Sequence, residues 1–107
     1  MDKFYLKRGD TSPALVFVLE PPSTVLSGAT VVFNMRNRST SVVAVSRAAA
    51  VIVTATGTPT VRYDWAAGDT ATAGTYDGEF EVTYSDLSVE TFPNASNITI
   101  VIAGDIA

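Results

Sequence analysis

The sequence predicts an all-β protein, an antiparallel sandwich of seven or eight short strands, on three observations. Valine and threonine are abundant whereas leucine and lysine are few, and β-branched residues favour strands. Apolar residues recur at every second position in several short segments, which is the period of a strand with one buried face. Polar residues, glycine and proline separate these segments at short intervals. With 107 residues, of which 47% are hydrophobic and 17% charged, the chain is expected to form one domain over residues 1–107 with its own core.

The first three predicted strands lie in the N-terminal third of the chain. KFYLK, residues 3–7, is followed by the polar turn RGDTSP. ALVFVLE, residues 14–20, is a continuous apolar run, which predicts a strand buried on both faces or one at the core of a sandwich. PPSTVLSG, residues 21–28, is expected to be loop. ATVVFNMR, residues 29–36, alternates, and its core face is predicted to carry Ala29, Val31, Phe33 and Met35.

The middle of the chain is less regular. Residues 41–53, SVVAVSRAAAVIV, contain enough alanine for a helix, but their many valines favour a sheet. We expect one or two strands there, with a break near Ser46–Arg47. VRYDW, residues 61–65, is predicted to be a strand whose inward side chains are Val61, Tyr63 and Trp65. AAGDTATAG, residues 66–74, is expected to be a turn with at most one helical turn.

TYDGEFEVTY, residues 75–84, is the most regular alternation in the sequence. Its outward side chains are predicted to include three acidic residues, and its inward side chains are predicted to be Tyr76, Phe80, Val82 and Tyr84. Gly78 falls on the inward face, where the missing side chain admits a bulky neighbour. We expect that neighbour to be Trp65.

A two-residue turn at Ser85–Asp86 is expected to lead into the next strand. This turn would pair Val82 with Val89, whereas a slip of one residue would turn Glu90 toward the core. The last predicted strand is NITIVI, residues 97–102, whose three isoleucines share one face.

Composition excludes several classes of function. The chain has neither cysteine nor histidine, which excludes disulfides, thiolate chemistry, the usual zinc sites and histidine-based acid–base catalysis. Its net charge of −4 opposes non-specific binding to nucleic acid. The segment MDKFYLKRGD is too polar for a signal peptide, and no apolar run approaches the length of a membrane span. We therefore expect the protein to fold in a cytoplasm.

The acidic residues Asp77, Glu79 and Glu81 are the sharpest candidates for chemistry. Residues two apart on a strand lie about 6.6–6.8 Å apart on one face, within the carboxylate separation of about 6.5–9.5 Å in inverting glycosidases. Catalysis also needs a cleft and a carboxyl group with a raised pKa, and no cleft is indicated. With Asp64 and Glu90 these acids could instead bind calcium, but a flat strand presents carboxylates in a line rather than around a point. We therefore expect no catalytic residue, no metal site and no cofactor.

Two further motifs have structural explanations. RGD at residues 8–10 matches an integrin-binding tripeptide, but glycine and aspartate ahead of a proline also form a turn. Arg36, Arg38 and Arg47 could contact phosphate, but three arginines in an acidic chain, without a stacking aromatic beside them, argue against nucleic-acid binding. The inward phase of the aromatic residues in 75–84 likewise favours core packing over a platform for glycans.

Five blocks follow one another over nearly the whole chain: FYLKRGDTSPAL, LSGATVVFNMR, VRYDWAAGDTATAGTYDGEFEVTYSD, ETFPN and ITIVI. In the order and spacing of these blocks, the sequence resembles the N-terminal domain of the phage baseplate upper protein family. Leu87 departs from the pattern, since a glycine is expected after the turn aspartate, and the loop around STSVVAVS departs as well.

The resemblance implies an immunoglobulin-like β-sandwich that serves as a building block of phage particles. In that family the domain attaches to the tail or baseplate core, and a following segment carries a receptor-binding module. Because AGDIA follows the last strand directly, we expect a stand-alone copy without that module. The expected function is that of a non-enzymatic virion structural protein, an adaptor in the tail or baseplate. A capsid decoration or head–tail joining protein, and a glycan-binding module, are the alternatives.

The expected partners are other virion proteins, in several symmetric copies, with neither nucleic acid nor a membrane among them. The expected location is the virion, and the host cytoplasm during assembly. Sheet edges and an exposed face are the surfaces expected to bind. The candidate interaction residues are Phe4, Leu6, Val43 and Val45 on the edges, and Asp77, Glu79, Glu81 and Glu90 on the acidic face.

Overall fold

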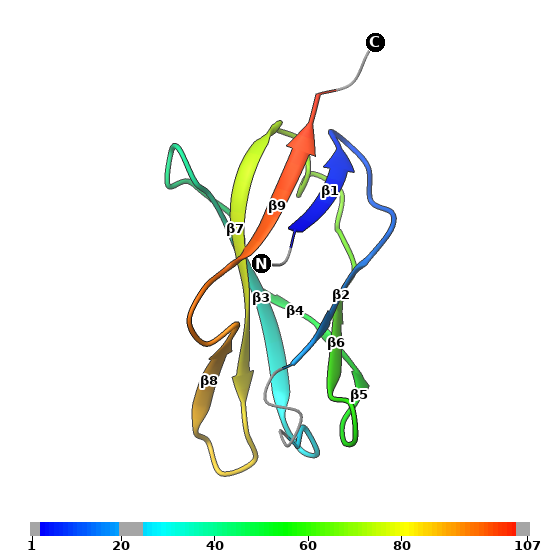
Figure 1. Cartoon of the computed structure of the whole chain (residues 1–107), viewed down its shortest axis with the longest axis vertical. Helices are drawn as coiled ribbons and strands as arrows, with labels where there is room; N and C mark the ends of the chain where they lie inside the picture. Colours follow the sequence, from blue (N-terminus) through cyan, green and yellow to red (C-terminus); the bar gives the residue numbers. More distant parts are fainter. Residues whose placement is uncertain (1–2, 20–24, 105–107) are drawn as a thin grey trace.

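The computed structural model describes residues 3–19 and 25–104, and within them the chain forms nine strands and no helix (Figure 1). The strands are β1 (Lys3–Lys7), β2 (Leu15–Val18), β3 (Thr30–Asn37), β4 (Val43–Ala49), β5 (Val51–Thr54), β6 (Thr60–Tyr63), β7 (Gly74–Thr83), β8 (Val89–Phe92) and β9 (Ile98–Ala103). The predicted all-β class is confirmed. The predicted number of strands, seven or eight, was too low by at least one, and residues 43–54 form two strands where one or two were expected.

The strands form two sheets. The larger has the order β1-β9-β7-β3-β4, with β8 also paired to β7, and the smaller has the order β2-β6-β5. All neighbouring strands in these sheets are antiparallel except β1 and β9, which run parallel. The expectation of a wholly antiparallel fold is therefore wrong at one pair. β1 lies beside β9 and runs in the same direction, and the chain then crosses to β2 in the smaller sheet (Figure 1).

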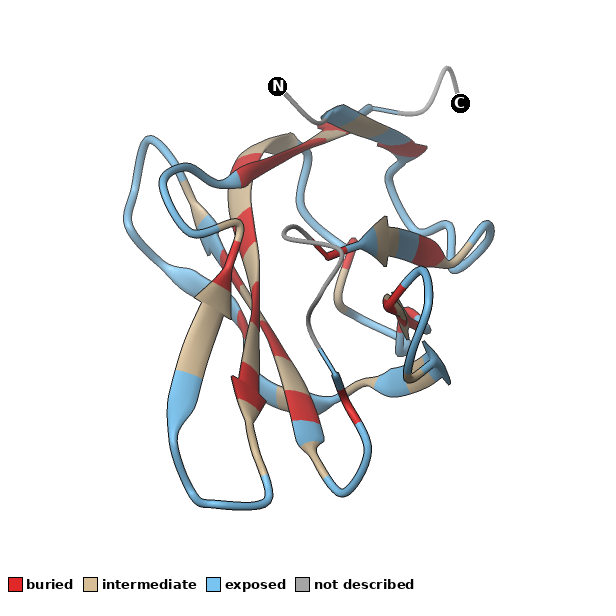
Figure 2. Cartoon of the chain, turned by 60° about the horizontal axis from the view of Figure 1, so that its bottom comes forward, coloured by how far each residue is buried: buried red, intermediate tan, exposed pale blue. Residues whose placement is uncertain are grey.

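The core lies between the two sheets. Figure 2 shows buried residues alternating with less buried ones along the strands. Phe33 of β3 is at its centre, with no exposed surface. Its ring stacks on that of Tyr63 in β6 at 4.6 Å between centroids, and it meets the ring of Trp65 edge-on at 5.8 Å. Phe17 of β2 stacks on Phe80 of β7 at 6.0 Å. Aromatic contacts of this kind add to the apolar burial that holds the layers together.

The predicted alternations account for most of this core. The fully or nearly fully buried residues include most of the inward residues expected for β3, β6, β7 and β9: Val31, Phe33, Met35, Val61, Tyr63, Trp65, Tyr76, Phe80, Val82, Ile98, Ile100 and Ile102. Ala29 and Tyr84, which were also predicted to face inward, are only partly buried against the core. Of the two alternatives predicted for β2, burial on both faces is wrong, and the structure agrees with a strand that places one face on the core. Val16 and Val18 are 55% and 44% exposed, because the smaller sheet has one face on the core and the other in solvent.

Residues 41–53 divide at a different point from the predicted one. At Ser46–Arg47 the strand does not end but bulges: the pairing with β3 shifts between Met35 and Phe33, and Arg47 has a φ of 49°. The break comes at Ala50, which lies between β4 in the larger sheet and β5 in the smaller one. The chain therefore changes layer at Ala50.

Gly78 faces inward as predicted, but Trp65 is not its neighbour. A Cβ atom at Gly78 would lie 2.5 Å from Cδ1 of Ile100 and 3.1 Å from Cζ of Phe33. These residues belong to β9 and β3, the two strands that flank β7 at this level. The glycine therefore admits its own sheet neighbours rather than a residue from the opposite layer.

The connection from β7 to β8 has one residue more than predicted. Leu87 N–H donates to the carbonyl of Tyr84 (2.9 Å), Tyr84 N–H donates to the carbonyl of Ser88 (2.8 Å), and Leu87 has a φ of 72°. Thr83 consequently pairs with Val89, and Val82 pairs with Glu90. The predicted pairing of Val82 with Val89 is therefore wrong by one residue, and Glu90 takes the core-facing side.

Some expectations fall outside the described residues. These are the end of the second predicted strand at Glu20, the first part of the loop at residues 21–24, and the tail at residues 105–107. The turn predicted at residues 66–74 is present without a helical turn.

Candidate interaction surface

β1 is one edge of the larger sheet, and its side chains divide cleanly between the two faces. Leu6 is buried, and Phe4 packs on the core with its ring 6.1 Å from that of Trp65. Lys3, Tyr5 and Lys7 face outward and are exposed. The predicted contact residues Phe4 and Leu6 therefore anchor the strand, while a partner would meet its outward residues.

β4 is the opposite edge of the larger sheet, and it divides in the same manner. Val45 is buried, whereas Val43 is 55% exposed and the preceding Val42 is 63% exposed. Of the two residues predicted to bind a partner at this edge, Val43 is accessible and Val45 belongs to the core.

The acidic row of β7 lies on the outer face of the larger sheet, as predicted, but arginines cover much of it. The guanidinium of Arg38 donates to one oxygen of Asp77 through Nε (3.1 Å) and Nη2 (2.8 Å), and Nη2 also donates to the hydroxyl of Thr99 (3.0 Å). Arg47 forms an ion pair with Glu81. Two of the three arginines considered for phosphate contacts, Arg38 and Arg47, thus bind carboxylates of their own chain.

Glu79 is the exception in this row, since no hydrogen-bond or ion-pair partner for it occurs among the described residues. Its side chain lies between the two neutralised carboxylates, opposite Asn34 of β3. The acidic face is therefore reduced to one unneutralised charge on this strand.

Glu90 does not belong to the acidic row. It lies opposite Val82, so it is on the core side of the sheet rather than on the outer face. Its carboxylate accepts hydrogen bonds from the hydroxyl of Tyr84 (2.7 Å) and from Nδ2 of Asn94 (3.1 Å). These bonds compensate for the partial burial of the charge.

A calcium site made from these acids is not assembled. Asp64 is held by Arg62, with Nε–Oδ1 and Nη2–Oδ2 distances of 2.8 and 3.1 Å, next to β6 in the other sheet. Among residues 3–19 and 25–104, no group of three or more acidic side chains is placed to hold a metal ion. Nor does this part of the chain contain a helix long and apolar enough to cross a bilayer.

The outer face of the larger sheet has two open hollows, and Asp77 lines both of them. One, of about 500 Å³, is lined by Lys3, Arg38, Thr75, Asp77, Asn97 and Thr99 among others. The other, of about 270 Å³, lies beside the bulge of β4 and includes Asn34, Arg36 and Glu79. Both are open to solvent, so they do not provide the shielded setting that raises the pKa of a catalytic carboxyl group.

A partly buried polar cluster joins Tyr63 of β6 to the connection between β6 and β7. The carboxylate of Asp69 accepts hydrogen bonds from the hydroxyl of Tyr63 (2.5 Å) and from Ala66 N–H (2.8 Å). Burial raises the pKa of Tyr63, and the hydrogen bond to Asp69 and its negative charge raise it further. Because both bonds stay within this connection, the cluster fixes the loop and leaves the phenol neutral.

Sequence reasoning missed several exposed apolar and aromatic residues. Tyr5 is 64% exposed on β1, and four valines lie on the outer face of the smaller sheet: Val16, Val18, Val51 and Val53. The alternation of KFYLK places Tyr5 on the face opposite to Phe4 and Leu6, so the exposure of Tyr5 could have been predicted. The exposure of the valines on the smaller sheet could not be predicted in this way. In the apolar run at residues 14–20 both faces are apolar, so the sequence does not show which face lies in solvent.

Comparison with known proteins adds no identification. A scan against protein-family models matched no family, and searches of curated proteins and of solved structures returned no match.

Proposed function

We propose that the protein is a non-enzymatic structural module of a bacteriophage particle, an adaptor that binds other virion proteins in the tail or baseplate. The resemblance of its sequence blocks to the N-terminal domain of the baseplate upper protein family suggests this role. The structural observation that supports it is the strand order of the two sheets, which is compatible with an immunoglobulin-like sandwich that has open edges.

The order of pairing supports the proposed immunoglobulin-like fold. Such sandwiches place strands C, F and G in one sheet and B, E and D in the other, and variable-type domains add C′ beside C. Here β3, β7 and β9 occupy the places of C, F and G, with β4 as C′, while β2, β6 and β5 occupy those of B, E and D. β1 runs parallel to β9 at the end of the larger sheet.

A second feature supports the same assignment. The hydroxyl of Tyr76, at the start of β7, donates to the carbonyl of Thr72 four residues earlier (2.7 Å). A tyrosine that bonds back to the backbone at the start of strand F is the tyrosine corner of immunoglobulin-like domains. The chain departs from antibody domains in having no cysteine and in carrying Phe33, not tryptophan, on the strand in the place of C.

An interaction role fits the way the molecule uses its residues. The large side chains of the alternating strands fill the core, while the sheet ends at β1 and β4 with exposed side chains. Edge strands offer unpaired backbone groups, and soluble proteins either protect them or use them for binding. Several symmetric copies would then contact their neighbours through the same edges.

Particle composition tests this proposal. Mass spectrometry of purified particles should detect the protein, and electron microscopy with a labelled copy should locate it at the tail or baseplate. A label on the capsid or at the head–tail junction would support the alternative of a decoration or joining protein. Absence of the protein from purified particles would refute both.

The contribution of the edges can be measured in the same system. We expect Val43→Lys to reduce incorporation, because it places a charge on the exposed side of β4. Leu87→Lys is a matched control, since Leu87 is 80% exposed on a hairpin far from both edges in the pairing order. Equal incorporation of the two variants would remove β4 from the interface.

A further inference from the structure

The outward residues of β1 present both their side chains and their backbone groups. Arg8 N–H donates to the carbonyl of Ala103 (2.7 Å), which fixes the phase of pairing with β9. Because bonding direction alternates along a strand, Phe4 and Leu6 turn their backbone groups toward β9. Lys3, Tyr5 and Lys7 therefore turn theirs to the open edge, while their side chains lie on the outer face.

The open edge is accessible. A hollow of about 260 Å³ runs beside it, lined by Tyr5, Leu6, Lys7, Asp10, Ser12 and Pro13. Asp10 N–H donates to the carbonyl of Lys7 (3.1 Å), so this carbonyl is already used and further pairing along the edge ends there. An added strand would thus pair chiefly with Lys3 and Tyr5.

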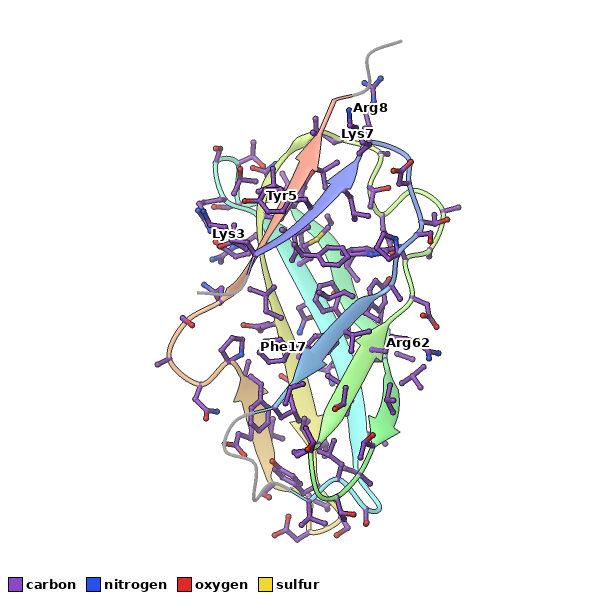
Figure 3. The ribbon with its side chains drawn as sticks, turned by 45° about the vertical axis from the view of Figure 1, so that its right-hand side comes forward. Lys3, Tyr5, Lys7, Arg8, Phe17 and Arg62 are labelled. Carbon is purple, nitrogen blue, oxygen red and sulfur yellow. The ribbon has the colours of Figure 1, made fainter. Side chains whose placement is uncertain are left out.

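The charge on this edge is opposite to that of the chain. Lys3, Lys7 and Arg8 are three of the seven lysine and arginine residues in a chain of net charge −4. Neither Lys3 nor Lys7 has a hydrogen-bond or ion-pair partner within the described residues. Figure 3 shows Lys3, Tyr5, Lys7 and Arg8 following one another along β1.

The side chains of β9 that lie beside Lys3, Tyr5 and Lys7 project little from the outer face of the sheet. Thr99, Val101 and Ala103 of β9 lie opposite Lys3, Tyr5 and Lys7, and all three are small. They leave the Tyr5 ring standing above the sheet, where it can cover an apolar side chain of a neighbouring strand.

We propose that β1 accepts an extended acidic segment of a partner protein as an added strand of the larger sheet. Carboxylates opposite Lys3 and Lys7, with an apolar residue opposite Tyr5, define the partner as an acid-x-apolar-x-acid segment. The inference rests on the proposed function, because it names the chemistry of the partner at one of its edges. Asp10, beyond Lys7 in the same hollow, disfavours a further acid in the partner on that side.

A second copy of the chain is a poorer occupant. The other edge strands of the described chain are LVFV, VAVSRAA, VIVT and VETF, and none carries two acidic residues. The triplet of acids in β7 is paired on both sides within its own sheet. Within the described residues no edge strand therefore offers this pair of acids, which favours a different protein as the partner.

Hydrogen exchange on the whole protein tests the geometry. The probe is the blocked peptide Thr-Glu-Thr-Val-Thr-Glu-Thr, with Thr-Lys-Thr-Val-Thr-Lys-Thr as its control. The acidic peptide should slow exchange of the Tyr5 amide, which faces the open edge, while leaving the Leu6 amide unchanged. Binding without protection of Tyr5 would mean that charge attraction alone holds the peptide, and would refute strand addition.

Substitutions test the two contributions separately. Lys7→Glu should weaken binding of the acidic peptide about tenfold at low salt, whereas Arg36→Glu, the same change of charge on β3, should leave it nearly unchanged. Tyr5→Pro should abolish binding and keep the fold, because a proline is tolerated where the N–H faces away from the sheet. Tyr5→Ala removes the ring but keeps the backbone N–H, so the acidic peptide should still protect the amide at position 5 from exchange.

Equal effects of Lys7→Glu and Arg36→Glu, or unchanged binding by Tyr5→Pro, would overturn the inference. These outcomes are independent of the proposed function, since they are measured on the isolated protein. If the peptide adds to β1 but the protein is absent from particles, the edge is a strand-binding site of some other assembly. If the protein is in particles but the peptide does not bind, only the inference about β1 fails.

Discussion

Gly78 is the residue at which the core leaves least room for change. An added Cβ would lie within 2.5 Å of Ile100 and would also crowd Phe33, and both neighbours are fully buried. Such a core cannot expand around one more carbon without displacing a rotamer or the backbone.

Gly78→Ala is therefore expected to lower the free energy of unfolding by about 1–3 kcal/mol. Denaturant unfolding of the variant measures this value. Gly104→Ala is the control, since no atom lies within 4 Å of its Cβ position. Ile100→Val removes the atom nearest to the new methyl group, so the double variant should be more stable than the sum of the single effects. Additive effects would show that Ile100 is not the obstacle.

The hairpin between β7 and β8 shows how one residue sets the register of an element. Leu87 adopts a φ of 72°, a left-handed conformation that costs a non-glycine residue about 1 kcal/mol. The turn is nevertheless fixed by Asp86, whose carboxylate accepts hydrogen bonds from the hydroxyl (2.6 Å) and the N–H (3.0 Å) of Ser88. These bonds lower the pKa of Asp86.

Leu87→Gly should raise the free energy of unfolding by roughly 0.5–1 kcal/mol, because it relieves the strain and loses almost no buried surface. Thermal or denaturant unfolding tests this change. Leu87→Ala retains a Cβ and should have no such effect, so an equal gain in both variants would contradict the explanation.

Tyr76 anchors a second element, the connection that leads into β7. Tyr76→Phe removes the hydrogen bond to Thr72 and keeps the buried ring, so it should cost about 1 kcal/mol of unfolding free energy. Hydrogen exchange should quicken around Thr72 before it quickens in β7. An unchanged free energy of unfolding would indicate that the hydrogen bond from Tyr76 to Thr72 does not stabilise the fold.

Elements with a strict alternation could be predicted from the sequence, and those with a special turn could not. In β3, β7 and β9 the period of two separates core from solvent without ambiguity, as the burial of Phe33, Phe80 and Ile100 shows. The register of β8 depended instead on a left-handed leucine, for which sequence propensity gives no warning. The layer change at Ala50 was hidden for a related reason, because a valine- and alanine-rich segment fits either sheet.

At the scale of the whole molecule, the site could be predicted less well than the fold. Both edges were located by sequence, but which side chains of Phe4, Leu6, Val43 and Val45 are accessible depends on the phase of each strand against the core. The acidic row was also predicted, yet its neutralisation by Arg38 and Arg47 depends on contacts between residues 34 and 39 positions apart. Such contacts exist only once the sheet order is set.

The stability of the whole sandwich should depend on alkaline pH through Tyr63. Its pKa is raised in the folded protein, whereas in the unfolded chain it ionises near its ordinary value of about 10. The folded state therefore holds more protons than the unfolded state above that pH, and stability should fall as the pH rises through this range. Unfolding followed from neutral to alkaline pH measures the decline.

Tyr63→Phe provides the comparison for this prediction. It removes the ionising group together with its bond to Asp69, so the variant should be less stable at neutral pH but should lose less stability in alkali. An identical alkaline slope in both proteins would assign the decline to other groups.

The parallel pairing of β1 with β9 has a mechanical consequence. Tension applied between Lys3, where β1 begins, and Ala103, where β9 ends, would draw the two strands past each other along their own length. Their evenly spaced bonds would then share the load and break together, rather than opening one after another like a zipper. Separating β1 from β9 should therefore need a much larger force when the pull is along the strands than when it peels β1 away sideways.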